Sequence, residues 1–217
     1  MKKQLPHILS LSTVAKSRLF EIQSVELKFS NGIDRTYERF RPFNRDSVMV
    51  IAIDGEELLL VREYAVGTEQ YELGFVKGGM DTGETPEQSA NRELQEEIGF
   101  GAKKWTFLRT MKINPQIMGH KMHVLLGEDL YPNQLEGDEP EPLEIVRYPL
   151  SQLNALLVSD EFNEARNLTA LYTLRDYLKL SCDINFPVYF EKWRYILKKR
   201  IFMQVLFKVN RLRLEFI

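Results

Sequence analysis

The chain has 217 residues, 44% of them hydrophobic and 28% charged, with a formal net charge of −2. That length suits one substantial domain with an appendage, and the near-neutral charge gives no general electrostatic basis for nucleic-acid binding. No run of 18 apolar residues predicts a membrane-spanning helix, the N-terminus lacks the apolar core of a secretion signal, and the single cysteine, Cys182, excludes an internal disulfide framework, so we expect a cytoplasmic protein.

The first predicted element is an antiparallel hairpin within residues 1–45. Its first strand, residues 20–29, alternates in part between apolar and polar side chains, and residues 36–40 form the returning strand. Asn31 and Gly32 lie between the two strands and are typical of a tight turn. Two strands are too few to fold alone in water, so the hairpin needs another surface to pack on.

The central segment, residues 46–180, predicts a mixed sheet with helices. We expect strands at 47–53, 58–64, 71–75, 105–112, 121–130 and 144–148. We expect helices at 86–98, 151–156 and 162–180, and an acidic loop at 131–142. Strands interleaved with one mid-chain and one terminal helix indicate the α+β class, with helices packed on a sheet.

The last segment, residues 181–217, differs in composition from the rest. Residues 191–217 contain eight Lys or Arg and two Asp or Glu, a net charge of +6, whereas the first 190 residues carry −8. A basic, aromatic and roughly helical stretch at 190–202 is of a kind that can lie on an anionic membrane surface. We favour packing on the domain, or an extension without a role, over membrane contact.

One acidic stretch carries the clearest functional signal. Gly78 is followed six residues later by Glu84, and then, after seven more residues, by the run Arg92-Glu93-Leu94-Gln95-Glu96-Glu97-Ile98-Gly99-Phe100. Glu93, Glu96 and Glu97 stand at i, i+3 and i+4, so a helix places the three carboxylates on one face. Such a cluster repels itself until a hard divalent cation relieves the repulsion, and Mg²⁺ prefers oxygen ligands. The stretch therefore predicts a magnesium site, with Mn²⁺ as the alternative metal.

Local signals set the limits of this helix. Thr85 suits the N-cap, Pro86 suits the first helical position, and Gln88 completes a capping box with Thr85. Gly99 is placed to end the helix in a left-handed conformation. Arg92 lies within the acidic run and can orient the carboxylates. Before the helix, three glycines let the loop backbone approach a phosphate closely: Gly78, Gly79 and Gly83.

The spacing G-x5-E-x7-R-E-U-x-E-E-x-G-U, in which U is a bulky apolar residue, resembles the Nudix hydrolase motif at every fixed position. The resemblance implies the Nudix fold, a mixed β-sheet sandwich packed between helices, and hydrolysis of a diphosphate joined to a nucleoside. It also implies that an activated water attacks a phosphorus while bound metal polarises the phosphate oxygens. In this scheme Glu93, Glu96 and Glu97 are metal ligands and the last two are catalytic. Supporting positions of the motif are Glu84, Arg92 and Gly99.

Four further stretches resemble the NudE-type ADP compounds hydrolases of bacteria, within the ADP-ribose pyrophosphatase branch: residues 62–69, 71–75, 136–142 and 162–167. This likeness implies ADP-ribose, NADH and diadenosine polyphosphates as substrates, with AMP as a product. It also implies a homodimer, because in that branch the N-terminal hairpin crosses onto a partner subunit.

The same resemblance places a general base in the acidic loop. The match falls best on Glu139 and second on Glu141. The alternative interpretation is a solvated loop that its prolines hold extended.

Several residues beside the glycine loop are candidates for substrate binding. Arg62 and Lys77 can meet phosphate charge, the alternative being ordinary surface lysine and arginine. Glu72 can accept a hydrogen bond from Arg92 or from a ribose hydroxyl. The set is completed by the backbone of Gly78 and Gly79.

Two aromatic residues and two histidines are candidates for stacking or for metal binding. Tyr64 and Phe75 can stack on an adenine, but aromatic residues in strands more often belong to a core. His120 and His123 are expected to be hydrogen-bonded or solvent-facing rather than metal ligands, because residues three apart on a strand point to opposite faces.

Two alternatives compete with the leading hypothesis, one within the enzymes and one of a different class. One is a strict ADP-ribose pyrophosphatase, and the other is a non-catalytic Nudix module that senses a nucleotide. The sensing module is disfavoured because all four motif carboxylates, including Glu84, are present. RNA-cap processing would need a basic groove, and only the tail is basic, so no nucleic-acid partner is expected.

Overall fold

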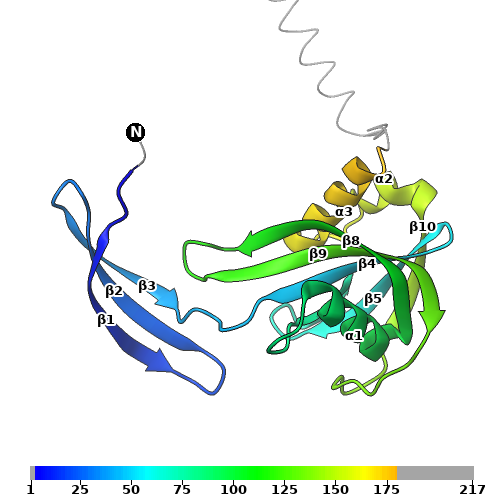
Figure 1. Cartoon of the computed structure of the whole chain (residues 1–217), viewed down its shortest axis with the longest axis horizontal. Helices are drawn as coiled ribbons and strands as arrows, with labels where there is room; N and C mark the ends of the chain where they lie inside the picture. Colours follow the sequence, from blue (N-terminus) through cyan, green and yellow to red (C-terminus); the bar gives the residue numbers. More distant parts are fainter. Residues whose placement is uncertain (1–2, 180–217) are drawn as a thin grey trace, which may run out of the picture. The chain divides into compact units, whose positions relative to one another are not determined.

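The structure is a computed structural model that describes residues 3–179 (Figure 1). The predictions made for the basic segment 181–217, and for the end of the terminal helix at residue 180, lie outside this range. None of the helices in residues 3–179 has the length and apolar character needed to cross a membrane.

The N-terminal region forms an antiparallel sheet of three strands, β1 (His7–Lys16), β2 (Glu21–Lys28) and β3 (Asp34–Phe40), in the order β1-β2-β3 (Figure 1). The predicted hairpin is the β2–β3 pair, with Gly32 in its turn at φ 81°. Strand β1 was missed. Its pairing with β2 is irregular between Ile8 and Ser10 and between Thr13 and Ala15, and such bulges break the alternation by which a strand is recognised.

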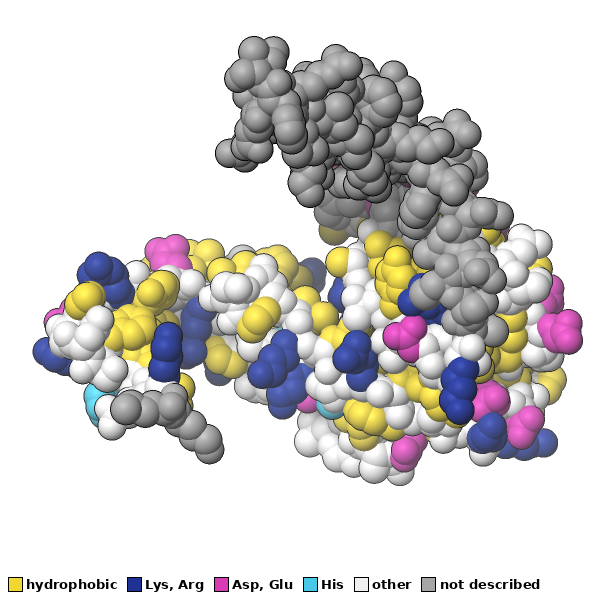
Figure 2. Space-filling model, turned by 90° about the horizontal axis from the view of Figure 1, so that it is seen from above, with side chains coloured by type: hydrophobic (Ala, Val, Ile, Leu, Met, Phe, Trp, Pro, Cys, Tyr) yellow, Lys and Arg dark blue, Asp and Glu magenta, His cyan; other side chains and the backbone are white. Residues whose placement is uncertain are grey.

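The two faces of this N-terminal sheet differ in polarity. Leu11, Val25 and Tyr37 lie in register across the three strands and therefore share one face. Ser12, Ser24 and Glu38 lie in the next register row, on the opposite face. Leu11 and Tyr37 are each 50% exposed. Figure 2 shows hydrophobic side chains at the surface of this region beside lysines and arginines.

A second sheet of seven strands carries the central domain. It contains β4 (Ser47–Asp54), β5 (Glu57–Ala65), β6 (Gln70–Gly74), β7 (Val76–Gly79), β8 (Phe100–Ile113), β9 (His120–Pro132) and β10 (Glu144–Pro149). The order is β10-β5-β4-β9-β8, with β6 paired to β5 and β7 paired to β4. Only the β4–β9 pair among these strands is parallel, so the sheet is mixed as predicted.

Helices cover the two faces of this sheet: α1 (Pro86–Ile98) lies on one, and a short 3₁₀ turn (Leu150–Gln152), α2 (Leu153–Leu156) and α3 (Ala165–Tyr177) lie on the other (Figure 1). Successive residues of β4 explain both cores. Met49 and Ile51 pack with α2 and α3, whereas Val48 and Val50 pack with α1. The prediction of an α+β fold, with a mixed sheet sandwiched between helices, is therefore confirmed.

The limits of α1 follow the predicted signals. Thr85 accepts a hydrogen bond from the Gln88 backbone, the Gln88 side chain returns one to the N-cap backbone, and Pro86 occupies the first position. Gly99 ends the helix at φ 74°. Helix α3 begins at Ala165, three residues later than predicted, because Glu164 is its N-cap. Phe162, the predicted first residue, instead packs in the core.

Two strand limits differ from the prediction. The glycine loop after residue 75 is in fact strand β7, in which Gly78 pairs with Val48. Glycine is depleted in strands, so composition alone argued against a strand there. Strand β8 starts at Phe100 rather than Trp105, directly after the helix, and it pairs with β9 along its whole length.

Candidate active site

The motif carboxylates gather at one pocket of about 600 Å³. Helix α1 buries Ala90, Leu94 and Ile98 against the sheet, which turns its acidic residues towards the glycine strand β7 and the acidic loop. The pocket is lined by Arg45, Lys77, Gly78, Gly79, Asp81, Arg92, Glu93, Glu96, Glu97, Glu136, Gly137, Asp138 and Glu139. Ten of these thirteen residues are charged, which suits a polar substrate and its cations.

Arg92 holds three of the four motif carboxylates. Its guanidinium donates to Glu84 at 2.9 Å, to Glu93 at 2.8 Å and to Glu96 at 2.8 Å, and it also reaches the Gly79 carbonyl at 2.8 Å. Hydrogen bonding to Arg92 lowers the pKa of the Glu84 carboxyl, which also accepts from the Asp81 backbone. The prediction that Arg92 can orient the acidic cluster agrees with these bonds.

Strand β7 approaches α1 very closely at Gly78. A Cβ at position 78 would lie 1.8 Å from the Glu93 carboxyl carbon and about as close to both carboxyl oxygens. Burial raises the pKa of Glu93, although Arg92 opposes the rise. Only glycine therefore allows the Glu93 carboxylate to occupy this place between helix and strand.

Glu97 is the most perturbed carboxyl of the site. Burial raises its pKa to about 8, although the Lys77 ammonium opposes the rise and the Glu93 carboxyl adds to it. Its Oε2 atom is buried and has no hydrogen-bond partner within the described part of the chain. An orphaned buried carboxylate oxygen facing a polar pocket is suited to bind a cation.

This donor set fits a hard divalent metal. It consists of carboxylate oxygens, including the unsatisfied Glu97 oxygen, and hard cations such as Mg²⁺ prefer oxygen ligands. No group of three or more His, Cys, Asp or Glu side chains in residues 3–179 is already arranged to hold an ion. Mg²⁺ usually keeps several waters and uses substrate phosphates, so it does not need a complete protein cage.

The acidic loop, residues 133–143 in the structure, brings Glu139 to the pocket. Burial raises the pKa of Glu139, and the carboxylates of Glu63 and Asp138 raise it further. Glu141 is placed differently: it lines a neighbouring hollow of about 440 Å³ and accepts a hydrogen bond from the Tyr71 hydroxyl. Of the two candidate bases, only Glu139 lines the pocket that holds all three metal-ligand candidates.

Some of the candidate substrate-binding residues line the pocket and others do not. Lys77, with Gly78 and Gly79, lines the pocket, and its ammonium donates to the Phe75 carbonyl at 3.0 Å. Arg62 is not among the lining residues and pairs with Glu161 at 2.8 Å and Glu144 at 3.6 Å.

Glu72 accepts from the Thr68 hydroxyl at 2.8 Å, and none of the Arg92 hydrogen bonds reaches it. The suggested Arg92–Glu72 bond is therefore wrong, because the guanidinium is already shared among the motif carboxylates.

Sequence reasoning missed Arg45. This residue lies just before β4, lines the pocket and pairs with Asp81 at 3.1 Å. Strand β4 pairs with β7, and this pairing brings Arg45 to the glycine strand. Its only sequence signal is a lone arginine ahead of an apolar strand, which is common on protein surfaces.

The aromatic and histidine candidates lie elsewhere. Phe75 is fully buried and packs edge-on against Phe162, so a stacking role for Phe75 is wrong. Tyr64 is half exposed and contacts Tyr71. His120 contacts the Ser47 hydroxyl, and His123 lies between Thr110 and Asp46, so both histidines are hydrogen-bonded as expected.

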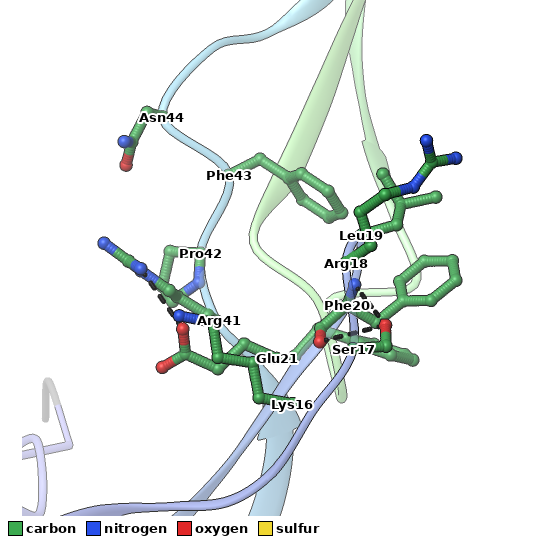
Figure 3. Close-up of a pocket in the computed structure, with 11 residues that line it drawn as sticks. Lys16, Ser17, Arg18, Leu19, Phe20, Glu21, Arg41, Pro42, Phe43 and Asn44 are labelled. Atoms are coloured by element: carbon green, nitrogen blue, oxygen red, sulfur yellow. Dashed lines mark hydrogen bonds and ion pairs between the residues drawn. The ribbon is translucent and has the colours of Figure 1, made fainter.

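A smaller hollow of about 240 Å³ lies at the β1–β2 turn and the segment Phe40–Asn44 (Figure 3). Arg41 pairs with Glu21 at 3.2 Å on its wall, and Ser17 and Phe20 bond each other across the turn (Figure 3). None of the motif carboxylates lines this hollow.

Comparisons with known proteins agree with this geometry. Residues 6–39 match the model of the NudE-type Nudix hydrolase N-terminal domain, and residues 43–172 match the NUDIX domain. The chain is 54% identical to the ADP compounds hydrolase NudE of Escherichia coli (strain K12) over 176 residues, covering 81% of this chain and 95% of that protein. It is 28% identical over 171 residues to the ADP-ribose pyrophosphatase of Bacillus subtilis (strain 168), covering 75% and 91%. A crystal structure of an ADP compounds hydrolase superposes with a TM-score of 0.80 at 54% identity, covering 82% of this chain and 97% of that one.

Proposed function

This chain belongs to the Nudix hydrolase family, as its NudE-type N-terminal domain and its Nudix domain show, and we propose that it hydrolyses the diphosphate linkage of ADP-containing compounds. The substrates would be ADP-ribose, NADH and diadenosine polyphosphates, and AMP would be one product. The observation that carries this proposal is the single polar pocket that joins Glu93, Glu96, Glu97, Lys77 and Glu139.

The family acts with a divalent metal, and we propose Mg²⁺, with Mn²⁺ as the alternative. Glu93, Glu96 and Glu97 would hold it, since α1 brings these three carboxylates to the pocket and such a cation prefers oxygen ligands. When bound, such a cation polarises phosphate oxygens and lowers the pKa of a bound water. Arg92 would keep Glu93 and Glu96 in place, since it donates a hydrogen bond to each.

Glu139 is our candidate for the general base. A base works best when its pKa lies near the working pH, and burial and neighbouring carboxylates raise that of Glu139. Lys77 would meet the diphosphate charge, and the backbone of Gly78 and Gly79 would allow its close approach. Arg45 adds a second cation on the same pocket wall. A phosphate contact by Arg62, or a ribose contact by Glu72, stays a prediction.

The test is a product assay with Mg²⁺ on ADP-ribose, NADH and diadenosine triphosphate side by side. Glu96→Gln is the control, because it removes one metal-ligand charge from an otherwise intact helix. AMP release from several substrates that is abolished in the variant would support the proposal. No turnover of any of them by the wild-type protein, despite metal binding, would contradict it.

A second candidate is a strict ADP-ribose pyrophosphatase, which the similarity to the Bacillus subtilis protein favours. It predicts turnover of ADP-ribose alone in the same assay. The higher identity to the ADP compounds hydrolase favours the broader range.

We also propose a homodimer in which the N-terminal sheet packs on a second copy. In its apolar row of Leu11, Val25 and Tyr37, the two outer residues, Leu11 and Tyr37, are half exposed. An apolar sheet face is normally covered by another part of the protein or by a partner. Leu19 and Phe20, beside the hollow of Figure 3, are exposed as well. A cytoplasmic location stays a prediction from the cysteine content.

A further inference from the structure

The acidic loop is attached firmly at its beginning. The Asn133 amide donates to the Gly99 carbonyl at 2.9 Å, and the Leu135 amide donates to the Gln95 carbonyl at 3.2 Å. The Gln134 side chain reaches the carbonyls of Gln95 and Glu96, each at 3.1 Å. The last turn of α1, whose carbonyls need partners outside the helix, therefore fixes the first three residues of the loop.

The rest of the loop has one hydrogen bond to another element. From Glu136 to Leu143, a stretch that the structure describes completely, this bond runs from the Tyr71 hydroxyl to the Glu141 carboxylate. Tyr71 lies on β6, opposite Tyr64 of β5, and the two rings meet edge to face at 5.5 Å. The Tyr71 side chain is thus anchored by the strand pairing of its backbone and by the contact of its ring with Tyr64.

Prolines restrict the backbone that joins Glu141 to Glu139. Pro140 lies between them and Pro142 follows, and each proline fixes its own φ angle and restricts the residue before it. A bond that holds Glu141 therefore also limits where the Glu139 carboxylate can lie. Without it, eight residues would be held only at their two ends.

We propose that Tyr71 is a positioning residue, whose hydroxyl holds Glu141 and so keeps Glu139 over the pocket. This inference rests on the proposed function, in which Glu139 is the general base. It assigns Glu141 the part of a hydrogen-bond acceptor rather than that of a second base. A misplacement of about 1 Å in a catalytic group can lower turnover strongly, so the bond has a catalytic effect at a distance.

The experiment compares Tyr71→Phe, Glu141→Ala, Glu141→Gln and the double variant Tyr71→Phe/Glu141→Ala in the full chain. Tyr172→Phe, which removes the hydroxyl of a 41% exposed tyrosine on α3, is the matched control. Steady-state kcat and KM are measured with ADP-ribose and Mg²⁺. NMR order parameters are measured for the backbone amides of residues 136–143, because they report the mobility of amides that have no hydrogen bond. Tyr71 is 56% exposed, so the loss of its hydroxyl should not unfold the protein.

We expect Tyr71→Phe and Glu141→Ala each to lower kcat by about tenfold, the order of one hydrogen bond to a charged acceptor, with KM nearly unchanged. Glu141→Gln should keep most of the activity, because its amide oxygen still accepts from Tyr71. The double variant should be no worse than either single variant, since both remove the same bond. The order parameters over 136–143 should fall in the three variants that lose the bond.

Three results would overturn the inference. The first is a wild-type kcat for Tyr71→Phe, and the second is additive losses in the double variant. The third is a Glu141→Gln variant that is as inactive as Glu141→Ala, which would show that Glu141 acts through its charge. If the wild-type protein cleaves no ADP compound, the proposed function fails. The order parameters still test the tether in that case, because unchanged values in Tyr71→Phe would disprove it.

Discussion

Gly78 and Glu93 lie so close that a Cβ on the glycine would fall 1.8 Å from the Glu93 carboxyl carbon. The strand that carries Gly78 is thus packed directly on a metal-ligand candidate. Gly78→Ala should displace the Glu93 carboxylate and lower kcat/KM by about 100-fold or more. Gly67→Ala, at a glycine with no neighbour within 4 Å of a built Cβ, is the control and should keep wild-type activity. Equal activity of both variants would show that Glu93 tolerates displacement.

Arg92 should stabilise the protein as well as organise the site. Arg92→Gln leaves Glu84, Glu93 and Glu96 without their shared partner, and we expect a loss of about 2 kcal/mol in the free energy of unfolding in urea. Mg²⁺ should restore more stability to this variant than to the wild type, because it neutralises the same carboxylates. Arg147→Gln, which breaks the exposed pairs with Asp54 and Glu57, should cost less than about 1 kcal/mol. Equal losses in the two variants would contradict this account.

Metal binding should release protons near neutral pH. Burial raises the pKa of Glu97 to about 8, so its carboxyl is mostly protonated at pH 7 in the metal-free protein, whereas a bound cation requires the carboxylate. Affinity for Mg²⁺ should therefore rise with pH up to about 8 and then level off. Titration calorimetry at pH 7 in buffers of different ionisation enthalpy should show a release of about one proton. The release should become small near pH 10 and shrink in Glu97→Gln; a release that is unchanged in this variant would point to another group.

Glu139→Gln should lower kcat by about two to three orders of magnitude while KM stays nearly unchanged. The amide keeps the size of the side chain but loses the negative charge and the capacity to take a proton. Glu136→Gln, a second acidic residue of the same pocket wall, is the charge-matched comparison. A Glu139→Gln enzyme with a near wild-type rate would remove Glu139 from the mechanism.

The dimer can be tested by light scattering at micromolar concentration, where we expect twice the 25.5 kDa of one chain. Leu11→Lys places a charge in the apolar row of the N-terminal sheet and should produce monomers. Ser12→Lys adds the same charge one residue later, on the polar face, and should remain dimeric. A wild-type monomer would refute the proposal.

Local patterns were enough to predict helix α1 and what it carries. Its capping box, its C-terminal glycine and the face shared by Glu93, Glu96 and Glu97 depend only on residues within a few positions of one another. The continuous apolar runs of β4 and β5 likewise indicated a central sheet, because a strand that is buried on both faces needs apolar residues throughout. Local sequence was therefore sufficient to predict the acidic centre and the class of the fold.

The distant residues that join this centre are set by contacts between elements far apart in the chain. Arg45 reaches the pocket through the β4–β7 pairing, and Arg62 is drawn instead to Glu161, 99 residues away. Glu139 and Glu141 look alike in sequence, yet one lines the pocket and the other bonds Tyr71. These outcomes depend on strand pairing and loop packing between residues far apart in the chain, and no local periodicity encodes such contacts.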